Sequence, residues 1–147
     1  MKKLIMLNFV LFLSATQYAH ADCRMNYTFE ILSDKVTEVG KKNLGIVGRN
    51  LIRKSKKMKY VSDGSENLMM QATFMESLDN SNTDRFQAFV SLKVFKLDTQ
   101  SKTEIAQFQG YGISKKLEKN AYASTQFKTA LKDAYKNIDS CKKINKL

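Results

Sequence analysis

Apolar and polar residues alternate in the segment that follows a short apolar leader. Residues 25–31 read Met-Asn-Tyr-Thr-Phe-Glu-Ile, with an apolar side chain at every second position. This period of two predicts a strand with one buried face. Ser33 and Asp34 come next and are expected to cap a helix. The following apolar positions have approximately helical spacing: Val36, Val39, Leu44, Val47, Leu51 and Met58.

Three glycines interrupt this helical pattern, at positions 40, 45 and 48. Each costs about 1 kcal/mol relative to alanine in a helix, which weakens the prediction. The alternative interpretation is that they let the helix pack closely on a sheet.

Three further strands are predicted, over residues 68–74, 86–94 and 105–113, with polar turn clusters between them. The middle one also has Phe89 and Phe95 on its second face, which predicts a central strand covered on both sides. In the third, Gly110 and Gly112 share one face and predict a bulge or a close backbone approach.

The clearest helix pattern lies near the end of the chain. Its apolar stripe has steps of three and four, with lysines on the opposite side: Ala123, Phe127, Ala130, Leu131, Ala134, Ile138 and Cys141. The order strand, helix, antiparallel meander, helix predicts an α+β fold in which two helices pack on one sheet.

The leader changes how the composition is interpreted. Residues 1–21 have a lysine pair, an apolar run and Ala-His-Ala at the end, which predicts a cleaved signal peptide. Its apolar run is shorter than the roughly 20 residues that span a bilayer, so no membrane-spanning helix is expected. Residues 22–147 then form a single domain, located in the periplasm or secreted. Loss of Lys2 and Lys3 lowers the net charge from +11 to about +9.

The chain has two cysteines, Cys23 and Cys141, near the two ends of the predicted mature protein. Export to an oxidising compartment favours a disulfide between them, which would join the termini. Intermolecular pairing and a free reactive thiol are the alternatives. The residues before Cys23 lack the apolar and small residues of a lipoprotein signal, so a lipid-modified cysteine is not expected.

Little catalytic chemistry is available to the predicted mature chain. The sole histidine of the sequence, His20, lies in the predicted leader. No imidazole is then left in the mature chain for a catalytic triad or a zinc site. The carboxylates share no motif, and Glu76 is interpreted as a strand-end residue turning into solvent. The turn 79–84 has several oxygens but lacks the glycine and terminal glutamate of a calcium loop. We therefore expect no enzyme activity, no metal and no cofactor.

The densest charge lies in residues 49–59, which we call the basic segment. Its basic residues are Arg49, Arg53, Lys54, Lys56, Lys57 and Lys59. In one interpretation they complement a helix dipole and solvate the surface. In the other they form a contact for an anionic partner, either an acidic protein surface or an anionic envelope component. Tyr60 alone does not supply the aromatic interleaving of a nucleic-acid platform, so nucleic acid is not expected.

The order of these elements resembles that of bacterial envelope modules: the amino-terminal domain of TolB and the related domains of curli-secretion and penicillin-binding-protein-activator lipoproteins. The resemblance rests on a basic helix end, a short strand, a turn between two long strands, a Gly-x-Gly strand end and an alanine-rich last helix. The first four are Leu51-Ile52-Arg53-Lys54, Met58 to Val61, Leu97-Asp98-Thr99 and Gly110-Tyr111-Gly112. It implies an envelope scaffold role and transfers no active site.

Taken together, these features predict a small non-enzymatic binding protein of the periplasm. The most specific hypothesis is an immunity or inhibitor protein that neutralises a toxin or hydrolase acting on the envelope, because a rigid domain loses little entropy on binding. The alternatives are an accessory module for envelope assembly and a binder of anionic lipid or cell-wall polymer.

Overall fold

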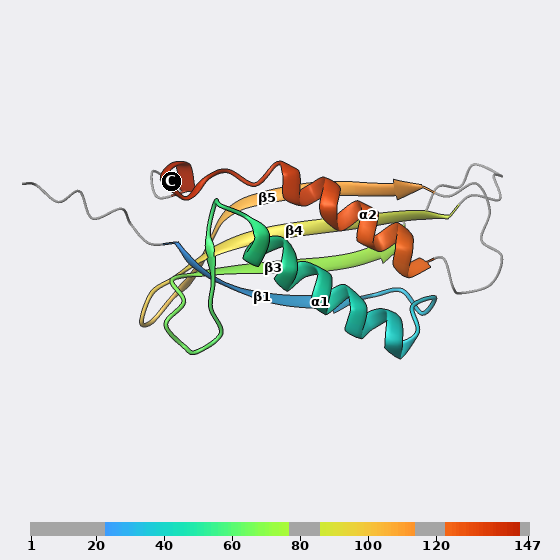
Figure 1. Cartoon of the computed structure of the whole chain (residues 1–147), viewed down its shortest axis with the longest axis horizontal. Coiled ribbons are helices and arrows are strands. Elements are labelled where there is room, and N and C mark those ends of the chain that lie inside the picture. Colours follow the sequence, from blue (N-terminus) through green and yellow to red (C-terminus); the bar gives the residue numbers. More distant parts are fainter. Residues whose placement is uncertain (1–22, 77–85, 114–122, 145–147) are drawn as a thin grey trace, which may run out of the picture.

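One mixed sheet and two long helices make up the computed structural model, which describes residues 23–76, 86–113 and 123–144 (Figure 1). The strands follow the order β2-β1-β3-β4-β5 in the sheet. Their bounds are β1 Arg24–Ile31, β2 Lys59–Tyr60, β3 Leu68–Glu76, β4 Gln87–Leu97 and β5 Lys102–Ile113. The helices are α1 Glu38–Lys54, α2 Ala123–Lys136 and the single turn α3 Cys141–Ile144.

The predicted α+β class and the antiparallel meander are confirmed. β3, β4 and β5 pair antiparallel in sequence order, while β1 pairs parallel with β3 on one side and with β2 on the other. Helix α1 connects β1 to β2, as the crossover between parallel strands requires.

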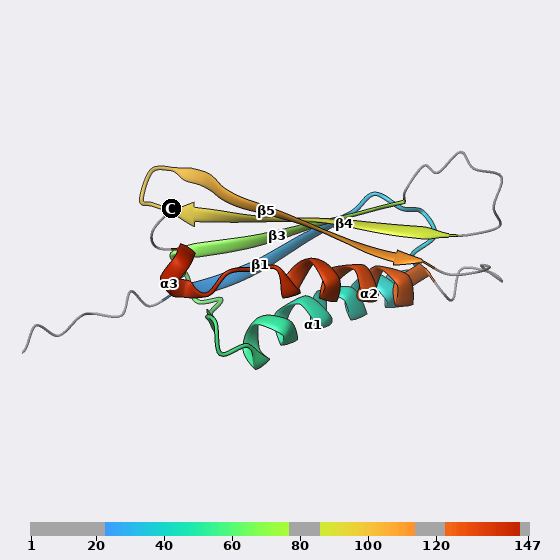
Figure 2. The ribbon, with the colours of Figure 1, turned by 90° about the horizontal axis from the view of Figure 1, so that it is seen from above.

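Both long helices lie on the same face of the sheet (Figure 2). Alternate residues of β3 and β4 point into the core that the helices cover, including Met70, Phe74, Val90 and Leu92, which are fully buried. From α2, Phe127 completes this core by meeting the Phe74 ring edge-on, with 5.6 Å between the ring centroids.

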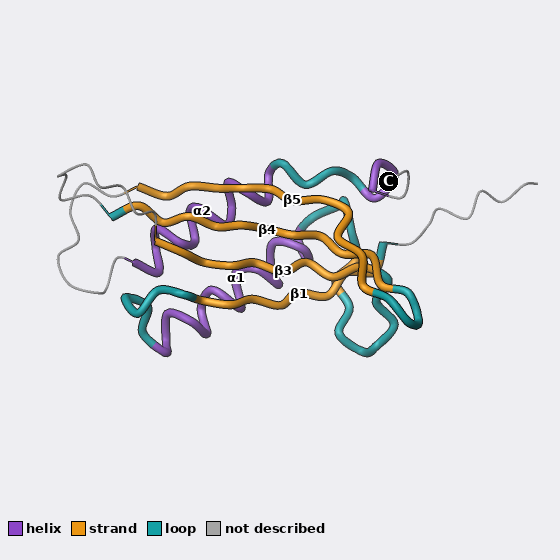
Figure 3. The backbone as a smooth tube through the Cα atoms, turned by 180° about the vertical axis from the view of Figure 1, so that it is seen from behind, coloured by secondary structure: helices purple, strands orange, loops and turns teal. Residues whose placement is uncertain are grey.

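β4 is an interior strand between β3 and β5, as predicted, but the prediction that it is covered on both faces is wrong. β4 is fourth in the sheet order, and in Figure 3 no described element covers the face that is turned away from the helices. Phe89 and Phe95 are half-buried there by their neighbours instead. The Phe89 ring lies 5.2 Å from that of Tyr111, and the Lys102 ammonium lies 4.0 Å from the centre of the Phe95 ring.

Glycines set how closely the helices approach the sheet, as the sequence predicted. A Cβ atom added to Gly110 would lie 2.0 Å from the carbonyl oxygen of Ala130, and one added to Gly112 would lie 2.2 Å from that of Gln126. The backbone of α2 therefore rests directly on the backbone of β5. On α1, Gly48 leaves room for the Tyr27 ring, because a Cβ atom added to Gly48 would lie 2.1 Å from a carbon of that ring.

The predicted helix boundaries need correction. α1 begins at Glu38 after Thr37, whose hydroxyl accepts a hydrogen bond from the Gly40 N–H at 3.1 Å. Ser33, the predicted cap, instead bonds to the Glu76 carboxylate. The helix ends at Lys54, within the residues named in the sequence analysis as a basic helix end, and Met58 lies beyond it; the last helical stripe is divided between α2 and α3.

The predicted disulfide is confirmed: Cys23 is bonded to Cys141, with 5.6 Å between the Cα atoms across 118 residues. It joins the start of β1 to the start of α3. Such bonds persist in oxidising surroundings, which indicates a location outside the cytoplasm. The predicted leader 1–21 and the turn 79–84 lie outside the described residues. Within the described ranges, no helix has the length and apolar character that crossing a membrane needs.

Candidate functional site

The basic segment lies where α1 runs into β2, and we also call it the basic end of the protein. Arg49, Arg53 and Lys54 belong to the last turns of α1, Lys56 and Lys57 to the connecting loop, and Lys59 to β2. Two buried side chains, Ile52 and Met58, hold the two sides of this loop in the core. The six predicted residues are thus brought together on a single short stretch with a fixed backbone.

Within this loop, Ser55 closes the helix and begins the turn. Its backbone N–H donates to the carbonyl oxygen of Ile52 at 3.1 Å, and its hydroxyl accepts from the Lys57 N–H at 3.0 Å. These two hydrogen bonds fix the backbone of the turn, and neither involves a charged side-chain group.

Three of the six cations have structural partners. The Lys57 ammonium donates to the carbonyl oxygen of Ile138 at 2.6 Å and lies 3.4 Å from that of Lys136, at the carboxyl end of α2. A cation there is favoured by the helix dipole and by the unpaired carbonyls. The Arg53 guanidinium stacks 4.7 Å from the centre of the Tyr60 ring, a cation–π contact.

Arg49 is the third. Burial raises the pKa of Tyr27 well above its ordinary value, and the positive charge of Arg49 opposes part of that rise. Arg49 is also partly buried, and one of its guanidinium nitrogens lies 3.7 Å from where a Cβ atom of Gly45 would stand.

The other three cations are exposed: Lys54, Lys56 and Lys59. Among the residues that the structure describes, the side chain of none of them forms an ion pair or hydrogen bond. The helix-dipole interpretation fits Arg53 and Lys54 in the last turn of α1 and Lys57 at the carboxyl end of α2. Lys54, Lys56 and Lys59, which we call the lysine triplet, are exposed to solvent and accessible to a partner.

Glu76, the most notable carboxylate in the sequence, is engaged. Ser33 donates to one of its oxygens at 2.5 Å, and the Lys35 ammonium lies 2.7 Å from the other. Partial burial raises the pKa of Glu76, but the hydrogen bonds from Lys35 and Ser33 and the Lys35 charge outweigh it, so the pKa lies below its ordinary value. The group fastens residues 33–35 to the end of β3, a role that sequence reasoning missed because the partners are over 40 positions apart.

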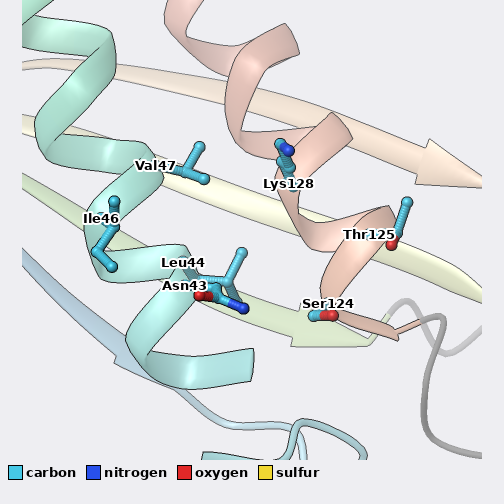
Figure 4. Close-up of a pocket in the computed structure, with 7 residues that line it drawn as sticks. All are labelled: Asn43, Leu44, Ile46, Val47, Ser124, Thr125 and Lys128. Atoms are coloured by element: carbon cyan, nitrogen blue, oxygen red, sulfur yellow. The ribbon is translucent and has the colours of Figure 1, made fainter. Parts of the chain in front are cut away.

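A groove between the helices is the second place where a ligand would fit (Figure 4). Its volume is about 260 Å³, and its lining comes from α1 and α2: Asn43, Leu44, Ile46, Val47, Ser124, Thr125 and Lys128. Sites for small molecules usually enclose about 300–1,000 Å³. The lining offers one ammonium, two hydroxyls and an amide, and it has no carboxylate and no imidazole. No cluster of metal-ligating side chains occurs in the described ranges 23–76, 86–113 and 123–144.

No family model and no curated protein matches this sequence. Among solved structures, the hypothetical protein CT253 from Chlamydia trachomatis is similar, with a TM-score of 0.53, 10% identity, and coverage of 78% of this chain and 92% of that one. A PelC variant, solved as a dodecamer from Paraburkholderia phytofirmans, gives a TM-score of 0.45 at 9% identity, covering 80% of this chain and 88% of that one. At such identity the likeness to CT253 concerns the fold alone.

Proposed function

We propose that the protein is a non-enzymatic binding protein of the periplasm whose basic end docks on an acidic surface of a partner protein. The observation that carries this proposal is the lysine triplet, three exposed cations on a backbone held by Ile52, Met58 and the Lys57 hydrogen bonds. Because the backbone is already fixed, little conformational entropy is lost when a partner binds.

The specific form of the proposal is an immunity or inhibitor protein against a toxin or hydrolase that acts on the cell envelope. Hydrolases of polysaccharides carry a pair of carboxylates in their active-site cleft. A cationic surface accelerates encounter with such a cleft and complements it on contact. The disulfide supports the location, since it links the two ends of the domain in a form that the reducing cytoplasm does not maintain.

A charge-reversal experiment tests this proposal. The variant K54E/K56E/K59E removes the triplet, and K42E/K96E/K132E makes the same change in net charge at three exposed lysines elsewhere on the surface. Tagged forms of both variants and of the wild type are incubated with periplasmic extract, and captured proteins are identified by mass spectrometry. We expect a near-stoichiometric hydrolase or toxin with the wild type and the control variant only. With that partner purified, association at low salt should be at least about tenfold slower for the triplet variant.

Vesicles distinguish the alternative, a binder of anionic lipid that uses the same surface. Wild-type protein is mixed with phosphatidylglycerol vesicles and with phosphatidylcholine vesicles over a range of salt. Tight, strongly salt-dependent binding to phosphatidylglycerol with no captured protein favours the lipid-binding alternative. Equal behaviour of the triplet and control variants in both assays contradicts a role for the basic end.

A further inference from the structure

The outer edge of β5 is a second surface that the basic end does not involve. β5 is the edge strand of the sheet, and it is long, with 12 residues, whereas the opposite edge strand β2 has two. Apart from its pairing with β4, β5 takes part in no backbone hydrogen bond with the rest of the described chain over residues 105–113. Its outward N–H and C=O groups therefore form a template on which another strand can pair.

Composition sets this edge apart. Residues 105–113 include no charged side chain, although 27% of the chain is charged. Residues 67–75, which include nearly all of the interior strand β3, are also free of charged side chains. Exposed edge strands are usually blunted by lysine, proline or inward-pointing charges. Here Lys102 and Glu104 stand only at the beginning of the strand. Residues 105–113 thus carry none of the charges that usually block the addition of another strand.

The side chains next to this edge are also unusually apolar for a surface. Tyr111 is 51% exposed and Ile113 is 60% exposed. With Phe89, whose ring contacts Tyr111, they form an uncharged corner on the sheet face away from the helices. A strand added to β5 would cover this corner.

The position of α2 decides what kind of strand fits. Antiparallel pairing of two copies about a two-fold axis would place both α2 helices on the same side of the joined sheet. Paired strands lie about 4.8 Å apart, whereas packed helices need about 8–10 Å between their axes. Because α2 rests directly on Gly110 and Gly112, a second α2 would collide with the first wherever these glycines of the two copies lie opposite each other. A strand with no helix over it has no such conflict.

We propose that the edge of β5 over residues 105–113 binds an extended, uncharged segment of a partner protein by strand addition. This protein is strongly basic as a whole, but its β5 edge carries no charge over residues 105–113, so the edge suits an uncharged segment of the partner. Backbone hydrogen bonds supply the affinity and the apolar corner supplies the side-chain selectivity.

Synthetic peptides test this proposal on the wild-type, disulfide-bonded protein. The probes are fluorescent peptides with the sequences of residues 105–113 and 67–75, two strand segments that carry no charge. Binding is measured by fluorescence polarisation, and hydrogen exchange locates the protected amides. We expect at least one peptide to bind with protection confined to β5, while the whole protein sediments as a monomer.

Backbone methylation provides the decisive control, because alternate N–H groups of a strand face opposite edges. Two versions of the bound peptide are methylated at alternate backbone nitrogens, three in each. One version should lose three hydrogen bonds and bind about a hundredfold more weakly, while the other should bind like the parent. Equal effects of the two patterns, or no binding by either parent peptide, refute strand addition. Dimerisation of the whole protein with β5 protected would assign the edge to a second copy instead.

This test is independent of the proposed function. The variant K54E/K56E/K59E should bind the peptide as the wild type does, because the triplet lies outside β5. A failure of the peptide experiment therefore does not contradict the role of the basic end. Likewise, a failure of the charge-reversal experiment does not contradict strand addition at β5.

Discussion

Replacing Gly110 with alanine tests the close contact between α2 and β5. The added methyl carbon would lie 2.0 Å from the Ala130 carbonyl oxygen and 2.4 Å from the Ala134 nitrogen. Both atoms belong to the helix backbone, so no side chain can rotate away to make room. Since ordinary contacts begin near 3.4 Å, helix and strand must separate by more than 1 Å.

The cost of that separation follows from what α2 buries. Helix α2 buries four of its side chains completely against the sheet: Phe127, Ala130, Leu131 and Ala134. Moving the helix away therefore loosens the packing of all four. Overpacking substitutions typically cost 1–3 kcal/mol, and a backbone clash belongs at the upper end, about 3 kcal/mol. With a typical urea slope of about 1.5 kcal/mol per molar, the unfolding midpoint should fall by about 2 M.

Urea unfolding of the oxidised mature protein, followed by circular dichroism, measures this change. Gln109→Ala is the matched control, because Gln109 is the exposed neighbour on the same strand and should change stability by less than about 0.5 kcal/mol. If Gly110→Ala shifts the midpoint no more than the control does, the close seating of α2 on β5 is refuted. Self-pairing of two copies at the β5 edge would then no longer be excluded by a helix collision.

Three further outcomes are expected. Cys141→Ser opens a 118-residue loop and should lower the free energy of unfolding by about 5 kcal/mol on the chain-entropy model, as measured by urea unfolding; an unchanged midpoint would contradict the bond. Glu76→Gln should cost about 1 kcal/mol or less at pH 7, since its ion pair is partly exposed. Because the folded pKa of Glu76 is lowered, its stabilisation is complete above the unfolded pKa and lost as the pH falls through the folded pKa, so thermal unfolding of variant and wild type should converge once the pH lies below the folded pKa. Lys57→Met should cost about 1–2 kcal/mol by uncapping α2, whereas Lys56→Met should be neutral; equal midpoints for the two would contradict the cap.

Local patterns were enough to predict the elements and the fold class. The alternation that begins at residue 25 matches the buried side chains of Met25 and Tyr27, although Phe29 is exposed. The stripe on residues 123–138 matches the buried face of α2, so both patterns are visible in the sequence. The disulfide was also predictable, since two cysteines in an exported chain have one intramolecular pairing. Close packing at Gly110 and Gly112 was indicated because glycine weakens a strand and is typical of places where another backbone comes near.

Contacts between distant segments were not predictable in the same way. The sequence predicts that the helices cover one face of the sheet, but it does not show that Phe89 and Phe95, on the other face, are shielded by the side chains of Tyr111 and Lys102. Likewise, the basic segment shows six cations and no sign that Lys57 reaches carbonyls about 80 positions away. Sorting the six into structural and available groups requires the fold, because it depends on where the carboxyl end of α2 lies.

Helix α2 connects the two candidate surfaces. Its carboxyl end accepts the Lys57 ammonium and so fixes the loop that presents the lysine triplet. Its middle rests on Gly110 and Gly112 and so determines what can pair with β5. Because a helix moves largely as a rigid body, displacing it at the glycines would also move the carbonyls that hold Lys57. The geometry of the basic end therefore depends on two glycines that lie on a different element and contact none of its lysines.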